Sequence, residues 1–94
     1  MTDSKTAIES MASDLKRAAL GLQRKSLAMS ECFLKEAINR VSELNLGSLP
    51  EYIKQIIQKI EIVDVKKAQD RMPEDFLMYS VLLQNYAIRL TQEV

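Results

Sequence analysis

The first half of the chain carries a regular row of apolar side chains. From residue 8 to residue 33 these positions recur at alternating steps of four and three, and one slot in the row holds the polar Ser26. Such spacing places them on one face of an α-helix, as in the contact seam of a coiled coil. The pattern therefore predicts one long first helix, from about residue 4 to residue 45. The row consists of Ile8, Ala12, Leu15, Ala19, Leu22, Met29 and Phe33, and Ala37, Val41 and Leu44 extend it.

A polar segment in the middle of this row leaves an alternative open. Lys16 and Arg17 precede Gly21, and residues 23–26 are all polar. A first helix could therefore end near residue 20 and another begin at Ser26. The continuous helix is favoured because the stretch is rich in good helix formers, and because neither Pro nor Asn occurs around Gly21.

Turn-forming residues follow the first helix. Gly47 suits the left-handed position just past a helix end. Ser48 is a good N-cap, Pro50 fits a first turn, and Glu51 stands three residues after Ser48, as a capping box requires. A second helix is predicted from about residue 49 to residue 67.

The last helix, predicted from about residue 73 to residue 92, has apolar side chains on two sides. It begins at Pro73, and eleven of the fifteen residues from Phe76 to Leu90 are apolar. At about 100° per residue they form two stripes. The first stripe holds Phe76, Tyr79, Leu83, Tyr86 and Leu90, and the second holds Leu77, Val81 and Ile88. We expect the first stripe to pack on the chain's own helices and the second to bind a neighbouring subunit or a partner protein. The alternative is that the second stripe is buried within the same chain, beneath the amino-terminal arm.

These elements predict an all-α fold in one domain, residues 1–94. A helix of about forty residues is roughly 60 Å long, whereas a compact chain of this size has a radius of gyration near 12 Å. Two shorter helices could not cover its amino-terminal arm, which includes Ile8 and Leu15. We therefore expect a homodimer that completes the helical bundle. With a break near Gly21, the alternative is a monomeric four-helix bundle.

Charge changes this picture in one region. Thirteen basic residues balance thirteen acidic ones, so no overall field attracts nucleic acid or anionic lipid. Residues 15–30, however, contain no acid and carry Lys16, Arg17, Arg24 and Lys25. Doubled by a two-fold axis, these side chains could form a basic band that binds phosphates or an acidic protein; the alternative is a solvated face. We do not expect nucleic-acid binding, because no aromatic residue is interleaved with these charges.

Compartment and redox state follow from two further features. No run of apolar residues reaches the length of a membrane span, and the first residues have no apolar signal core, so we expect a cytoplasmic protein without membrane contact. The single cysteine, Cys32, cannot form an internal disulfide, which agrees with a reducing compartment. We expect Cys32 to act as a small buried hydrophobic residue.

The residue types of this chain give little indication of catalysis. The chain has no His and no Gly-rich phosphate loop, so we assign no catalytic residue, no metal ligand and no cofactor. Glu36, Arg40 and Glu43 stand at helical steps and are expected to form a solvated salt-bridge ladder. We expect a non-enzymatic helical interaction protein, such as an adaptor, regulator or chaperone-like protein, that binds a protein partner.

The alternative function is a small dimeric helical enzyme that acts on an anionic metabolite. A long first helix followed by two shorter ones resembles the layout of the small all-helical chorismate mutases. That resemblance implies cationic side chains around a dianionic substrate, for which Arg24, Lys25, Arg40 and Gln84 qualify by residue type. The family's Arg-plus-Asp pattern on the first helix is not present, so the resemblance is one of layout.

Overall fold

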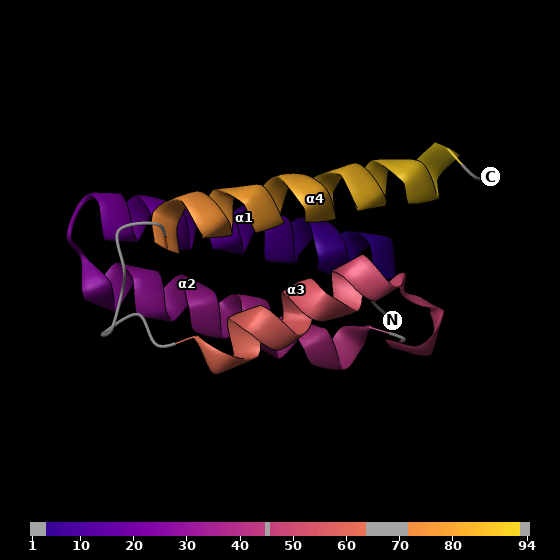
Figure 1. Ribbon diagram of the computed structural model, residues 1–94, viewed down its shortest axis with the longest axis horizontal. Coiled ribbons are helices and arrows are strands. Elements are labelled where there is room, and N and C mark those ends of the chain that lie inside the picture. Colours follow the sequence, from indigo (N-terminus) through magenta and orange to yellow (C-terminus); the bar gives the residue numbers. More distant parts are fainter. Residues whose placement is uncertain (1–3, 45, 64–71, 93–94) are drawn as a thin grey trace.

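This computed structural model describes residues 4–44, 46–63 and 72–92. In these ranges four α-helices form an antiparallel bundle of 41 × 20 × 20 Å (Figure 1). Two short 3-10 turns connect the second and third helices. The elements are α1 (Ser4–Gln23), α2 (Leu27–Asn39), η1 (Arg40–Glu43), η2 (Leu46–Ser48), α3 (Glu51–Ile62) and α4 (Met72–Gln92). The predicted all-α bundle is confirmed.

The chain reverses direction after Gln23, so the prediction of one continuous first helix is wrong and the alternative of a break near Gly21 is confirmed. The Ser26 N–H donates to the Gly21 carbonyl at 2.7 Å, and the Lys25 N–H donates to the Leu22 carbonyl at 3.1 Å. These two bonds define a Schellman motif, whose left-handed residue here is Lys25 with φ 60°. The reversal lets both halves of the apolar row be buried within one chain. The free energy of this burial outweighs the helix propensity of the residues at the break.

The left-handed Lys25 leads to a prediction on stability. A residue with a Cβ pays about 1 kcal/mol or more in this conformation, whereas Gly does not. Lys25→Gly should therefore raise the free energy of unfolding by about 1 kcal/mol, measured by urea denaturation followed by circular dichroism. Arg24→Gly, one residue earlier and without a positive φ, is the control and should not stabilise. Equal loss of stability in both variants would contradict the assigned turn.

Gly21 has a different role from the one its position suggested. It lies within α1, and a Cβ built on it would stand 2.8 Å from the Ser30 nitrogen and 3.1 Å from the Ser30 Cα, both backbone atoms of α2. The backbones of the first two helices thus approach each other closely at Gly21. Ser26 caps α2, its side chain accepting from the Met29 N–H at 3.4 Å.

The core is built around α1, which packs against both α2 and α4. Ile8, Met11 and Leu15 of α1 are fully buried, so the amino-terminal arm is covered by the chain itself. This removes the reason for which we expected a dimer; the oligomeric state stays a prediction. α3 closes the remaining side of the bundle through a second set of buried side chains, Ile53, Ile56, Ile57 and Ile60.

The start of α3 differs in detail from the prediction. Pro50, not Ser48, occupies the N-cap, and it makes no side-chain cap hydrogen bond because its ring carries no donor or acceptor. Gly47 lies in η2 and its φ is not positive, so the left-handed conformation predicted for Gly47 is wrong. α3 ends at Ile62, and the predicted extension over 64–67 lies outside the described residues.

In α4 the two predicted stripes separate by burial. Phe76 and Leu83 of the first stripe are buried, and Tyr79 and Tyr86 are partly buried against the core, so this stripe packs on the chain's own helices as predicted. In the second stripe Val81 and Ile88 are exposed, whereas Leu77 is partly buried and contacts the core. Leu77 therefore differs from the two residues with which it was grouped.

Candidate protein-binding face

A groove of about 320 Å³ runs between α1 and α4. One hydrogen bond holds its floor, since the buried Ser80 hydroxyl of α4 donates to the Ala12 carbonyl of α1 at 2.7 Å. Its polar lining can orient an incoming group, while its two helices give it rigid walls. The lining residues are Glu9, Ala12, Ser13 and Lys16 from α1, and Ser80, Gln84 and Ile88 from α4.

An apolar edge continues the groove along α4. Met78, Val81 and Ile88 are 51%, 55% and 48% exposed, and helical spacing places all three within about 80° of one another. Large apolar side chains that are exposed side by side are typical of a surface that contacts another molecule. We refer to the groove lining together with Met78 and Val81 as the α1/α4 face.

Opposite charges stand at the two ends of this face. Glu9 and Lys16 are seven residues apart and therefore lie on the same side of α1. Because α1 and α4 are antiparallel (Figure 1), Glu9 lies toward Ile88 and Lys16 lies toward Ser80. Glu9 also forms an exposed ion pair with Lys5 at 3.0 Å within α1. Such an exposed pair contributes little to stability. It leaves the second carboxylate oxygen of Glu9 able to accept a hydrogen bond from another cationic side chain.

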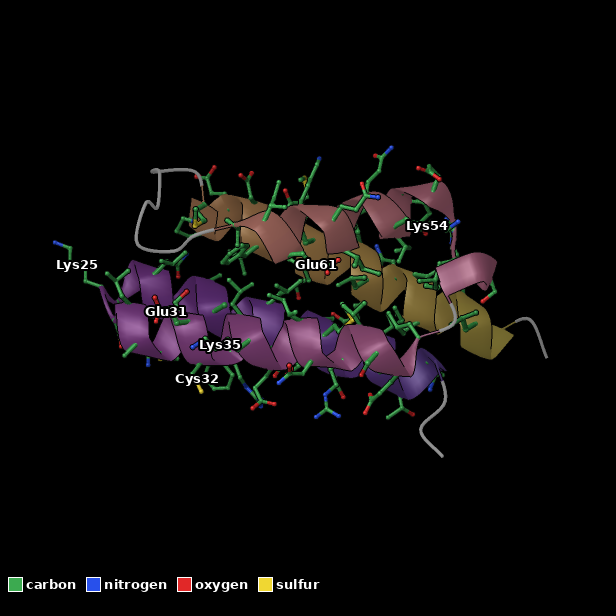
Figure 2. All side chains as sticks on the ribbon, turned by 90° about the horizontal axis from the view of Figure 1, so that it is seen from below. Lys25, Glu31, Cys32, Lys35, Lys54 and Glu61 are labelled. Atoms are coloured by element: carbon green, nitrogen blue, oxygen red, sulfur yellow. The ribbon has the colours of Figure 1, made fainter. Side chains whose placement is uncertain are left out.

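The four basic residues of the predicted band do not share one surface. Lys16 lines the groove, whereas the Arg17 guanidinium turns toward α2 and lies 5.6 Å from the centre of the Phe33 ring. Arg24 and Lys25 belong to the turn between the helices, and Lys25 projects from the end of the bundle (Figure 2). Arg24 lies beyond the end of α1 at Gln23, so it does not continue the helix that carries Arg17.

Asp14 of α1 is buried, and Glu36 of α2 and Arg40 of η1 are close enough for their charges to act on it. Burial raises the pKa of its carboxyl above the ordinary 3.8; the nearby Arg40 and Arg17 oppose this rise, while Glu36 adds to it. The Arg17 Nη1 is 4.0 Å from the Asp14 Oδ1. The predicted ladder exists in part, since Arg40 Nη1 contacts Glu43 Oε1 at 3.5 Å. Arg40 and Glu36 thus act on Asp14 through their charges, and none of these residues lines the groove.

Asp14 gives a prediction on pH dependence. A raised pKa in the folded state means that its contribution to stability is full below the unfolded pKa of about 3.8 and is lost as the pH rises through the folded value. At pH 7 the charged carboxylate therefore lowers stability. Asp14→Asn should unfold at higher urea than the wild type at pH 7, and this difference should shrink below about pH 4. A less stable Asn variant at pH 7 would show that attraction to Arg17 and Arg40 outweighs burial.

Cys32 is exposed, so the expectation that it fills the core is wrong. Leu34 and Ala37 of α2 face the core, and this orientation of the helix directs Cys32 outward, as Figure 2 shows. It is not part of the groove lining.

The α1/α4 face contains residues that sequence reasoning did not select, among them Glu9 and Ser13. No local signal marks them, because the groove exists only where two helices about seventy residues apart come together. Within residues 4–44, 46–63 and 72–92, no cluster of three or more acidic or Cys side chains could hold a metal ion. None of the helices in these ranges combines the length and apolar character that a bilayer span requires.

The chain was also compared with known proteins. No family model, no curated protein and no solved structure matches it. The α1/α4 face itself is therefore the basis for inferring a function. The layout that resembled the helical chorismate mutases depended on a long first helix, and α1 ends at Gln23.

Proposed function

We propose that this protein is a non-enzymatic interaction protein that binds a protein partner through the α1/α4 face. The observation that carries the proposal is the exposure of Val81 and Ile88 on a helix whose other side is fully buried at Leu83 and Ala87. Removing half-exposed apolar side chains from water is favourable, and a second protein surface is the usual means of doing so.

The composition of the face also suits a protein partner. Protein interfaces combine an apolar centre with polar groups that fix orientation. Here the apolar edge of α4 lies beside the Ser13 and Gln84 side chains, with one charge at each end. Because Cys32 is an exposed single thiol, a reducing compartment suits the chain, and we propose that it acts in the cytoplasm.

Affinity capture with matched variants tests the proposal. Tagged wild type, Val81→Asp and Ile88→Asp are used as baits, and Leu27→Asp is the control because Leu27 is 45% exposed on another helix, α2. Captured chains, including untagged copies of this protein, are quantified by mass spectrometry. We expect the two α4 variants to lose a captured protein that wild type and Leu27→Asp retain. All variants should keep helical circular dichroism, since each changed side chain already faces water.

A second arm examines the enzymatic alternative. Thermal-shift measurements with anionic metabolites should leave the melting temperature of the wild type nearly unchanged, because binding to the native state alone would raise it. A strong rise with one metabolite, together with capture that does not depend on Val81 or Ile88, would overturn the proposal.

A further inference from the structure

The arrangement of charges and apolar side chains on the α1/α4 face identifies its occupant. We infer that the face binds a second copy of this chain, lying antiparallel across a two-fold axis that runs in the interface at right angles to the helices. The inference rests on the proposed function, which it makes specific by naming the partner.

The charges of α1 are self-complementary about such an axis. Glu9 and Lys16 lie on the same side of α1, and the midpoint between them falls between Ala12 and Ser13, where the side chains are short. A two-fold axis through that midpoint places Glu9 of one copy beside Lys16 of the other, and the reverse pair forms at the opposite end. One chain thereby supplies both members of two intermolecular ion pairs.

The apolar edge of α4 crosses the same axis. The Ser80 hydroxyl bonds to the Ala12 carbonyl, so the level between Ala12 and Ser13 on α1 corresponds to Ser80 and Val81 on α4. Val81 is 55% exposed. The axis that pairs Glu9 with Lys16 therefore also places Val81 of one copy beside Val81 of the other, and burial and charge favour the same arrangement.

Size and net charge are compatible with this dimer. Each long side of the bundle measures 41 × 20 Å. A contact over the whole of one such side would cover about 800 Å², as much as each partner buries in a standard-size interface. The formal net charge is zero, so no overall repulsion opposes the approach of two copies. Because few large apolar side chains contribute, we expect a dissociation constant on the order of 10 μM.

Charge-swap variants examined by sedimentation velocity, from about 1 to about 200 μM, test the inference. The mass of the wild type should rise with concentration toward twice the 10.7 kDa of the chain. Lys16→Glu places Glu opposite Glu at both ends, and Glu9→Lys places Lys opposite Lys, so each variant should weaken the dimer about tenfold at low salt. An equimolar mixture of the two variants should dimerise again, because every contact then joins opposite charges.

Recovery of the dimer in the mixture distinguishes a weakened interface from a loss of folding. A variant that is unfolded cannot be restored by its counterpart. Lys35→Glu, on α2 and outside the groove lining, is the matched control and should dimerise as the wild type does. A monomer at every concentration overturns the inference, as does a dimer that neither charge variant weakens. A monomeric wild type whose captured foreign protein is lost in Val81→Asp would sink the inference and leave the proposed function standing.

Discussion

Leu83→Asp is expected to unfold the protein, whereas Val81→Asp, two residues earlier in the same helix, leaves it folded. Leu83 is fully buried in the core, and an aspartate there would place an unpaired charge among apolar side chains. We expect a loss of about 4 kcal/mol or more in the free energy of unfolding, which is a large part of the stability of a domain of this size. Helical circular dichroism and urea denaturation measure the effect.

Val81→Asp is the matched control because it makes the same change in the same helix at a side chain that is 55% exposed. Its cost should stay within about 1 kcal/mol, mainly from the lower helix propensity of Asp. Collapse of Val81→Asp together with a folded Leu83→Asp would show that the two sides of α4 are assigned the wrong way round.

Gly21→Ala should destabilise the bundle, although the same change inside a helix ordinarily stabilises by about 1 kcal/mol. The new methyl group would stand 2.8 Å from the Ser30 nitrogen and 3.2 Å from the Ser26 carbonyl oxygen. Both are backbone atoms, so relief requires α2 to move away from α1 as a whole. We expect a net loss of about 2 to 3 kcal/mol, measured by urea denaturation.

Gly47→Ala is the control for that measurement. Gly47 is exposed in η2 and has no positive φ, so the alanine variant should be neutral or slightly more stable. If Gly21→Ala gained stability like an ordinary helix position, the backbones of α1 and α2 would not be in close contact at Gly21.

Local pattern determined the class of fold and the last helix. The spacing of Phe76, Leu83 and their neighbours fixes one apolar side at 100° per residue, whatever that side contacts. Pro73 stands in the first turn of α4, close to where the sequence predicted the helix to begin. Periodicity alone therefore predicted an all-α bundle and separated the buried Leu83 from the exposed Val81 and Ile88.

Periodicity did not decide where the first helix ends. The apolar row continues across residues 23–26 without a change of phase, and Lys25 is a poor residue for a left-handed position. The break is favoured only when α2 folds back on α1 and buries side chains far from the turn. Gly21 did mark the region, but glycine is needed there because a Cβ would stand too close to the Ser30 backbone of α2. The burial of Ile8 and Leu15 followed from the same reversal.

The candidate site depended on tertiary structure still more strongly. The sequence by itself determined that α4 has more apolar surface than one stripe can use, and it selected Val81, Ile88 and Lys16. Only the packing of α4 on α1 joined Lys16 and Glu9 to that surface, and only the rotation of α2 about its axis decided that Cys32 is exposed. The physical reason is that helix periodicity depends on neighbours within one turn, whereas a groove depends on which helices meet and at what level.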